Sequence, residues 1–369
     1  MTPEEIELLS ELTIIIPTYN RPLELERTIE YWRDLPVTVH ILDGSEKPWF
    51  VEGCQPGTKS IFYHSFQPRD ESPTENWGRR LKFGTNLMTT RFAALCCDDD
   101  VYTASGLSRA LAMLNSESFD AVAGNAGEYR TEGGCIKWVH KYPELKDEPA
   151  KGSSNIGERL MFRDGTQAFY GVFLSEKLKL IHDIGNSYSF PVPIWHEELI
   201  STLIRIFCRI KFVGELFWLK NAINYPMARP IKFAPLFWDN NFCEHREKFI
   251  EAMSKSLLLA DPAMTEDVTF ELITNFKNQF AKPRKYKKTV VKLKAQMLRS
   301  IGKLPEFARE AMFACLPSGL KKRLGNSNFE VNFKPVVLLS EQDLMNDSLK
   351  KWEKILLMPR EELRLRANI

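Results

Sequence analysis

Three short apolar segments of the sequence each end in a cluster of polar residues, and this pattern constrains the fold more than any other feature. The segments are TIIIP followed by TYN (13–20), VTVHIL followed by DGS (37–45) and FAALCC followed by DDD (92–100). Apolar, partly β-branched runs of this length, bounded by turn residues, are typical of buried strands. We therefore expect three strands whose ends carry the polar residues.

The residues between these segments have helical spacing. Pro22 suits the first turn of a helix, and Leu25, Ile29 and Trp32 follow at intervals of four and three residues. A further strand over 59–66 and a helix over 80–91 complete the alternation. Alternating strands and helices predict an α/β, Rossmann-like fold with a mostly parallel sheet and helices on both faces.

Sheets of this kind bind ligands beyond the carboxyl ends of their strands, so the three polar clusters are expected to form one pocket. No glycine-rich phosphate loop occurs in the sequence. If the pocket holds a nucleotide, a metal ion on the aspartates could neutralise the phosphates. A solvated strand end is the alternative interpretation.

Three adjacent carboxylates repel one another and raise each other's pKa unless a cation lies among them. We expect Asp98 and Asp100 to bind Mn²⁺ or Mg²⁺, which prefer oxygen ligands. Because neighbours on an extended chain alternate in direction, Asp99 is expected to point away from Asp98.

A second group of acids occurs where another helix is expected to begin. Pro191 and Pro193 precede the sequence HEELISTLIRIF, in which apolar residues recur at helical spacing, so Glu197 and Glu198 are predicted in its first turn. Either glutamate could act as a general base, or both could simply interact with the helix dipole.

Residues 199–219 are long enough to resemble a membrane span, but four charged residues, among them Arg205 and Arg209, would lie in hydrocarbon. We interpret this segment as an amphipathic helix that runs into a strand.

Over roughly residues 13–220 the sequence resembles inverting family 2 of the GT-A glycosyltransferases. Four segments, taken in order, carry the resemblance: TIIIPTYNRPLELERTI, ILDGS, LCCDDDVY and HEELISTLIRIFCRIKFVGELFWL. The resemblance implies a GT-A fold and a hexosyl- or N-acetylhexosaminyltransferase that depends on Mn²⁺ or Mg²⁺. It implies a nucleotide-sugar donor, usually a UDP-sugar, and as acceptor a hydroxyl group of a glycan or of a lipid-linked molecule.

The resemblance also implies roles by position. The family's DxD motif corresponds to Asp98, which would face the ribose, and Asp100, which would ligate the metal. The family's Glu-Asp pair corresponds to Glu197 and Glu198; the second member is usually the base, but two glutamates here leave the choice open. The implied nucleotide-sugar-binding residues are Pro17, Thr18, Tyr19, Asn20, Asp43, Asn86, Asp98 and Asp99.

The chain of 369 residues is long enough for a catalytic domain and an appendage. We expect a GT-A catalytic domain at 1–235, with a nucleotide-sugar half at about 1–105 and an acceptor half at about 106–235. A mainly helical C-terminal extension at 236–369 would follow.

The extension contains a basic segment, 272–305, with ten Lys and Arg and no Asp or Glu, although the net charge of the chain is only +2. Apolar residues at helical spacing within 282–303 suit an anionic membrane surface. A helix packed on the catalytic domain is equally compatible. Nucleic acid is an unlikely partner, because a single aromatic residue, Tyr286, interrupts the charges within 282–303.

The sequence has seven cysteines without a CxxC pair, and its acidic N-terminus lacks a basic leader region. These features favour a cytoplasmic location. Peripheral attachment to the inner face of the membrane is compatible with that location. Two other functions stay open at this point. A nucleotidyltransferase would need a glycine-rich loop after the first strand, and a non-catalytic carbohydrate- or nucleic-acid-binding protein would use the basic segment without turnover.

Overall fold

The computed structural model describes residues 1–50, 54–56, 59–66, 73–116, 118–132, 135–140, 152–161, 168–221, 233–280 and 346–367. These residues belong to one compact unit, Met1–Phe280 with Leu338–Ile369. The helix predicted within 282–303 lies outside the described residues, and the domain boundary near 235 stays a prediction.

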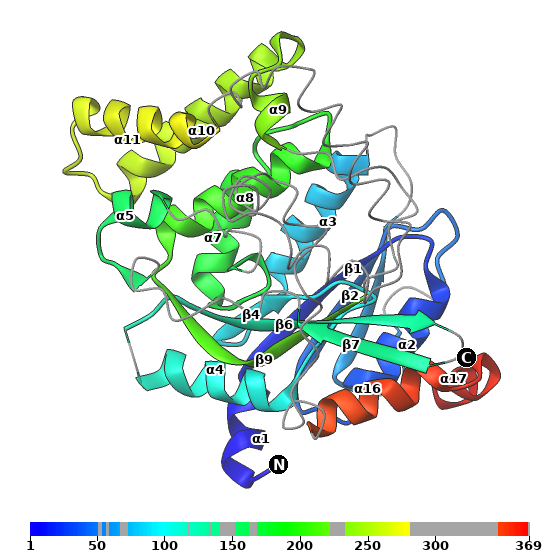
Figure 1. Cartoon of the computed structure of the whole chain (residues 1–369). Coiled ribbons are helices and arrows are strands. Elements are labelled where there is room, and N and C mark those ends of the chain that lie inside the picture. Colours follow the sequence, from blue (N-terminus) through cyan, green and yellow to red (C-terminus); the bar gives the residue numbers. More distant parts are fainter. Residues whose placement is uncertain are drawn as a thin grey trace, which may run out of the picture. The chain divides into compact units, whose positions relative to one another are not determined.

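The described strands form one nine-stranded sheet in the order β3-β2-β1-β4-β8-β6-β9-β5, with β7 paired to β6 (Figure 1). Neighbours are parallel from β3 to β4 and between β6 and β9, whereas β8, β5 and β7 run antiparallel to the strands beside them. The prediction of a mostly parallel α/β sheet is therefore confirmed. The strands are β1 Leu12–Thr18, β2 Thr38–Asp43, β3 Ile61–Ser65, β4 Phe92–Leu95, β5 Val101–Tyr102, β6 Ala121–Glu132, β7 Cys135–His140, β8 Val172–Leu174 and β9 Ile210–Asn221.

Helices connect the strands and follow the sheet. They are α1 Pro3–Ser10, α2 Pro22–Trp32, α3 Pro73–Asn86, α4 Ala104–Ser116, α5 Ile156–Met161, α7 Ser175–Gly185, α8 Pro193–Phe207, α9 Phe233–Phe237, α10 Cys243–Ala260, α11 Glu266–Gln279, α16 Asp347–Leu357 and α17 Arg360–Ala367, with a short 3₁₀ helix at Asn240–Phe242. Proline occupies the first turn of α1, α2 and α8, where its missing N–H has no helical partner to lose.

The two faces of the sheet carry separate apolar clusters, because successive side chains of a strand point to opposite faces. Ile14 and Ile16 of β1 pack in the cluster that contains α2, α4 and α16. Ile15, between them, packs in the other cluster with α3, α7, α8, α10 and α11. Helices therefore cover both faces, as predicted.

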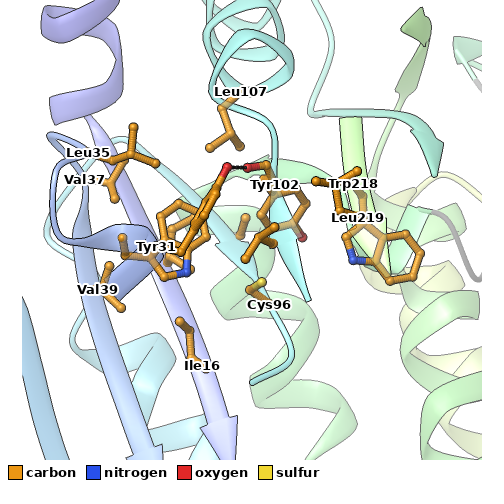
Figure 2. Close-up of a cluster of buried hydrophobic side chains, with 14 of the residues drawn as sticks. Ile16, Tyr31, Leu35, Val37, Val39, Cys96, Tyr102, Leu107, Trp218 and Leu219 are labelled. Carbon is orange, nitrogen blue, oxygen red and sulfur yellow. Dashed lines mark hydrogen bonds between the residues drawn. The ribbon is translucent and has the colours of Figure 1, made fainter. Parts of the chain in front are cut away.

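Figure 2 shows part of the first cluster, in which Tyr31 of α2 lies beside Tyr102 of β5. The Tyr31 hydroxyl donates to the Tyr102 backbone oxygen at 2.6 Å, and the Tyr102 hydroxyl donates to the Leu95 backbone oxygen at 2.5 Å. These bonds satisfy polar atoms inside an apolar layer. They also tie α2 to β5 and to the end of β4, which precedes the three aspartates.

The C-terminal helices pack on the N-terminal helix α2, beside it in Figure 1. Glu26 of α2 is fully buried, and its carboxylate pairs with Arg360 at 3.1 Å and Arg364 at 3.2 Å. The connection matters for the site, because α2 also holds Thr28, whose hydroxyl donates to the Asp98 backbone oxygen at 2.5 Å.

Two predicted helices differ in their bounds. The helix expected over 80–91 is α3 and ends at Asn86, because the β-branched Thr89 and Thr90 that follow are poor helix formers. The segment 199–219 does divide into a helix, α8, and a strand, β9, as predicted. However, α8 already begins at Pro193, so Glu197 and Glu198 lie in its second turn, where the helix dipole acts on them less.

Candidate active site

Strands β1, β2 and β4 bring their carboxyl ends to one edge of the sheet. Thr18, the last residue of β1, pairs with Asp43, the last residue of β2, and the Cys96 amide after β4 donates to the Ile15 backbone oxygen at 3.0 Å. A pocket of about 290 Å³ opens at this edge. We call it the donor pocket; it is lined by Pro17, Thr18, Tyr19, Arg21, Trp77, Arg80, Cys97, Asp98, Asp99, Asp100, Tyr170, Lys220 and Asn221.

Asp98 is fixed by partners from β1 and from the turn after it. Its Oδ2 accepts a hydrogen bond from the Thr18 hydroxyl at 2.7 Å, and its Oδ1 accepts one from Arg21 at 2.8 Å. Burial raises the pKa of Asp98 to about 6, although Arg21 opposes the shift. The carboxyl is therefore held in position with both oxygens engaged.

Asp99 and Asp100 form a group with Cys97 in which one potential ligand atom from each residue lies within 4.8 Å of the others. The Asp100 carboxylate also accepts from Trp218 Nε1 at 3.2 Å and from the Asn221 amide at 3.1 Å. Burial, followed by the charge of Asp99, raises the pKa of Asp100 well above its usual range.

This donor set fits a hard divalent cation. Each carboxylate oxygen can accept two bonds, so Asp100 keeps capacity for a metal beside its two protein donors. A bound cation would favour the charged form of Asp100, which burial disfavours. The Cys97 thiol is a softer ligand, and burial raises its pKa well above the ordinary value, so the two oxygens match Mn²⁺ or Mg²⁺ better.

The expectation that Asp99 points away from Asp98 is wrong. Arg21 Nη1 lies 2.8 Å from Asp98 Oδ1 and 3.3 Å from Asp99 Oδ2, so the two carboxylates converge on one guanidinium group. The reason is local: β4 ends at Leu95, and the Asp100 amide donates to the Cys97 oxygen at 3.3 Å, closing a turn. Alternation of side chains does not apply in a turn.

Other predicted nucleotide-binding residues occupy different surroundings. Asp43 is buried, and its carboxylate accepts from the Ser45 amide at 2.8 Å and from the Tyr63 hydroxyl at 2.5 Å. Asn20 adopts a positive φ of 53° in the turn after β1, and its amide donates to Ser45 Oγ at 2.7 Å. Both residues shape the loops beside the donor pocket without lining it.

Tyr19 lines the donor pocket and is 48% exposed, so its ring is accessible for stacking on a base. Asn86 is not brought to this pocket. It ends α3, is exposed, and its side-chain oxygen accepts a hydrogen bond from Lys179 of α7.

Two stacked aromatic rings lie beside Asp100, and one of them, that of Tyr170, lines the donor pocket. Tyr170 and Trp218 stack with centroids 4.0 Å apart and planes inclined by 19°. The Lys220 ammonium lies 5.5 Å from the Trp218 ring centre, and the Tyr170 hydroxyl lies 3.3 Å from Cys97 Sγ. Trp218 is therefore part of the buried core and also donates a hydrogen bond to Asp100.

The two glutamates of α8 face different partners. Glu198 Oε1 lies 3.1 Å from the buried guanidinium of Arg205, about two turns further along the same face of the helix. Glu197 keeps solvent contact, and its charge acts on Tyr170 and Lys220, both of which line the donor pocket. Desolvation by the surrounding protein raises the pKa of Glu197, with Lys220 opposing and Glu198 adding to the shift.

Several pocket residues were missed by the sequence analysis. Arg21 could have been found, because three adjacent carboxylates require a cation and Arg21 lies in the turn after the first strand. Tyr170 and Lys220 come from distant segments, and no local pattern marks them. The pairing of β9 with β5, which begins directly after Asp100, brings Lys220 to this edge.

Comparison with known proteins gives a family for much of the chain. Residues 13–179 match the sequence model of glycosyl transferase family 2. This part of the protein has the GT-A, family 2-like fold expected from the motifs, and the match favours a glycosyltransferase over the nucleotidyltransferase and non-catalytic alternatives. No curated protein matches the sequence.

Among solved structures, the chain is similar to TarS of S. aureus. For TarS residues 1–349 the identity is 13%, the coverage 96% of this chain and 91% of that chain, and the TM-score 0.47. For TarS residues 1–349 in complex with UDP-GlcNAc the identity is 15%, the coverage 72% of this chain and 71% of that chain, and the TM-score 0.43. Scores below 0.5 carry no functional assignment. In the described part of the chain, no helix is long and apolar enough to cross a membrane.

Proposed function

We propose that this protein, whose residues 13–179 match the sequence model of glycosyl transferase family 2, transfers a sugar from a UDP-sugar, with inversion, to a hydroxyl group of a glycan or lipid-linked acceptor. The observation that carries the proposal is the donor pocket, where carboxylates from the end of β4 meet Thr18 and Arg21 from the end of β1.

The charges of the donor pocket support a metal-bound donor. Three aspartates and three basic residues, Arg21, Arg80 and Lys220, line it, so its formal charge balances without a ligand. A diphosphate brings two negative charges into a partly buried site, and a divalent cation that enters with it keeps the balance. Metal dependence follows from this electrostatic argument.

We assign the metal to Asp100 and Asp99, with Asp98 beside them. This differs from the pair expected from the DxD motif, because potential ligand atoms of Asp99, Asp100 and Cys97 lie within 4.8 Å of one another, whereas Asp98 does not belong to this group and Arg21 lies 2.8 Å from its Oδ1. When bound, Mn²⁺ or Mg²⁺ would stabilise the charge that develops on the leaving diphosphate. Asp98, held by two donors, is placed to accept from a ribose hydroxyl as the family resemblance implies.

We assign the general base to Glu197 in preference to Glu198. Glu198 is held by Arg205, whose guanidinium lies 3.1 Å from Oε1 and turns the carboxylate along α8. Glu197 interacts with Tyr170 and Lys220 at the donor pocket and has a raised pKa, which makes it a better proton acceptor for an acceptor hydroxyl. Lys220 interacts electrostatically with both Glu197 and Asp100, so it would favour negative charge on a leaving group bound beside them.

We also propose, from the sequence alone, that the acceptor lies at a membrane surface. The basic segment 272–305 would hold the enzyme at an anionic membrane surface, at about 1 kcal/mol for each docked basic residue. Co-sedimentation with vesicles of anionic and of neutral lipid tests this. Equal sedimentation with both, or no decrease at high salt, would remove the membrane from the proposal.

The donor assignment is tested by thermal unfolding with UDP, with and without Mn²⁺. A ligand that binds only the folded state raises the melting temperature, so UDP should stabilise the protein more when Mn²⁺ is present. Asp100→Ala should lose this metal-dependent part. Full transferase activity in the presence of EDTA, or an unchanged Mn²⁺ effect in Asp100→Ala, would contradict the proposal.

A further inference from the structure

Arg21 pairs with two of the three aspartates of the donor pocket. Its Nη1 lies 2.8 Å from Asp98 Oδ1 and 3.3 Å from Asp99 Oδ2. The side chains of Asp98 and Asp99 are only 5% and 10% exposed, whereas that of Arg21 is 35% exposed. The guanidinium group therefore supplies the positive charge that two buried carboxylates need.

Asp99 is also one of the residues that we assign to the metal. A potential ligand atom of Asp99 lies within 4.8 Å of those of Asp100 and Cys97. A divalent cation bound there would lie close to Arg21, because the same carboxylate group contacts both. Like charges repel more strongly in a partly buried site than in water, because the effective dielectric constant is lower. In its present position, Arg21 therefore opposes the binding of a cation at Asp99.

The two arginines of the donor pocket are held in different ways. Arg80 is buried, and its Nη1 donates to the Thr18 backbone oxygen at 2.7 Å and to the Leu42 backbone oxygen at 2.9 Å. Arg21 is the residue directly before α2, and among the described residues its guanidinium contacts the two aspartates. Arg21 can therefore turn away from the aspartates without breaking a side-chain contact to the backbone.

Asp98 keeps two other contacts if Arg21 moves. The Thr18 hydroxyl donates to Asp98 Oδ2 at 2.7 Å, and the Thr28 hydroxyl donates to the Asp98 backbone oxygen at 2.5 Å. Both threonines are buried. The hydrogen bonds from β1 and α2 thus hold Asp98 in position, and the ion pair with Arg21 is a contact that can be exchanged.

A diphosphate in the donor pocket would offer Arg21 another partner. Arg21 lines this pocket together with Asp99 and Asp100. A guanidinium group binds phosphate oxygens through two parallel hydrogen bonds, which an isolated ammonium group cannot do. If Arg21 exchanges the carboxylates for the diphosphate, it remains paired, and Asp99 becomes available to a cation that accompanies the diphosphate.

We propose that Arg21 couples the binding of the nucleotide-sugar donor to the binding of the metal: it pairs with Asp98 and Asp99 until a diphosphate takes its guanidinium group, and Asp99 then receives the cation. The inference rests on the proposed donor and metal and deepens that function, because it makes the two bind together. Coupling between two ligands is reciprocal, so Mn²⁺ and UDP raise the affinity for each other by the same factor.

The test compares the full-length wild type with Arg21→Gln, which removes the charge and keeps a polar side chain. Electron paramagnetic resonance of free Mn²⁺ gives the affinity for Mn²⁺ alone, and calorimetry gives the affinity for UDP in EDTA and in saturating Mn²⁺. Arg21→Gln should bind Mn²⁺ alone about tenfold more tightly than the wild type, equivalent to about 1.4 kcal/mol. The factor by which Mn²⁺ raises the affinity for UDP should be about tenfold smaller. Direct contact between cation and diphosphate preserves the rest of the coupling.

Two further variants serve as controls. Arg109→Gln makes the same change at an exposed arginine that pairs with Glu215 and does not line the donor pocket, so it should behave as the wild type. Arg21→Lys retains the charge and should bind Mn²⁺ alone as the wild type does. Its coupling should nevertheless fall, because an ammonium group lacks the paired phosphate contact. Arg21→Lys decides the question if Arg21→Gln does not fold.

The outcomes separate this proposal from the proposed function. If Arg21→Gln binds Mn²⁺ alone no more tightly than the wild type, or if its coupling equals that of Arg109→Gln, the proposal is overturned and Arg21 only holds the two aspartates. The donor assignment would stand in that case, because the wild type would still bind UDP more tightly with Mn²⁺. No binding of UDP by the wild type would instead contradict the donor assignment, and this proposal with it.

Discussion

The indole ring of Trp218 lies nearly parallel to the phenol ring of Tyr170, with 4.0 Å between their centroids. Each ring of the stack also carries a polar group that faces the candidate metal site. Trp218 Nε1 donates to Asp100 Oδ2 at 3.2 Å, and the Tyr170 hydroxyl lies 3.3 Å from Cys97 Sγ. Two residues of the candidate metal group are therefore oriented by one aromatic pair, which comes from β9 and from the segment before β8.

This arrangement predicts that Trp218→Phe weakens metal binding while it preserves the fold. Phenylalanine keeps the ring stack with Tyr170 but cannot donate to Asp100, and loss of a partner of this kind typically lowers metal affinity about 10-fold or more. The measurement is the Mn²⁺ concentration that gives half of the UDP-dependent rise in melting temperature. A purely structural Trp218 would lower the melting temperature without ligand and leave that concentration unchanged.

The two glutamates of α8 give a second prediction. Glu197→Gln keeps the size of the side chain and removes proton acceptance, so kcat should fall by about 10²-fold or more while UDP binding persists. Glu198→Gln loses the ion pair with Arg205 and should lower the melting temperature with a smaller effect on kcat. If Glu198→Gln has the larger effect on kcat, the roles assigned to the two residues are reversed.

The pH dependence of kcat provides a separate check of the base. Glu197 must be unprotonated to accept a proton, and its pKa is raised above the ordinary value by desolvation. The rate should therefore fall as the pH is lowered through this raised pKa and recover fully above it. Glu197→Gln should lose this acidic limb, whereas Glu198→Gln should retain it.

The sequence predicted the parts of the fold that depend on local patterns. Apolar runs ending in polar clusters gave β1, β2 and β4, and the sheet brings the ends of these strands together. The predicted direction of the Asp99 side chain was wrong, because β4 ends three residues before the aspartates and a turn follows. Where a strand stops depends on its neighbours, which a run of apolar residues does not contain.

Contacts between distant segments were not predictable from the sequence alone. Lys220 reaches the donor pocket because β9 pairs with β5, the strand that follows Asp100, and Tyr170 because β8 is inserted antiparallel between β4 and β6. Similarly, the sequence could not show that Arg205, seven residues after Glu198, would occupy its carboxylate. The ion pair within α8, together with the tertiary contacts that bring Tyr170 and Lys220 near Glu197, distinguishes the two adjacent glutamates.

The ion pairs between α2 and α17 predict a coupling between the two ends of the chain. Glu26 is fully buried, and Arg360 and Arg364 are its partners. Changing both arginines to alanine leaves a buried carboxylate without a counter-charge, and should lower the unfolding free energy by about 1–3 kcal/mol, less than for a fully buried pair because the arginines are partly exposed. Chemical denaturation measures this value.

A matched control separates charge from packing in that experiment. Adding Glu26→Gln to the double arginine variant removes the uncompensated charge, so part of the lost stability should return. If the triple variant is no more stable than the double one, the arginines act through packing on Trp49, over whose ring both guanidinium groups lie, at 5.5 and 5.2 Å.

The last prediction concerns stability in mild acid. Burial lowers the pKa of His182 to about 3 and of His196 to about 4, with His196 adding to the shift of His182. Unfolded histidine has a pKa near 6.5, so the unfolded chain binds more protons between pH 6.5 and pH 4. Stability should therefore fall as the pH decreases through this window, by up to about 1.4 kcal/mol per pH unit for each histidine.

The His182→Leu variant lacks one titrating group, so the unfolding free energy of the variant should decline less between pH 6.5 and 4 than that of the wild type. Parallel curves for the two proteins would show that His182 is protonated equally in the folded and unfolded chains.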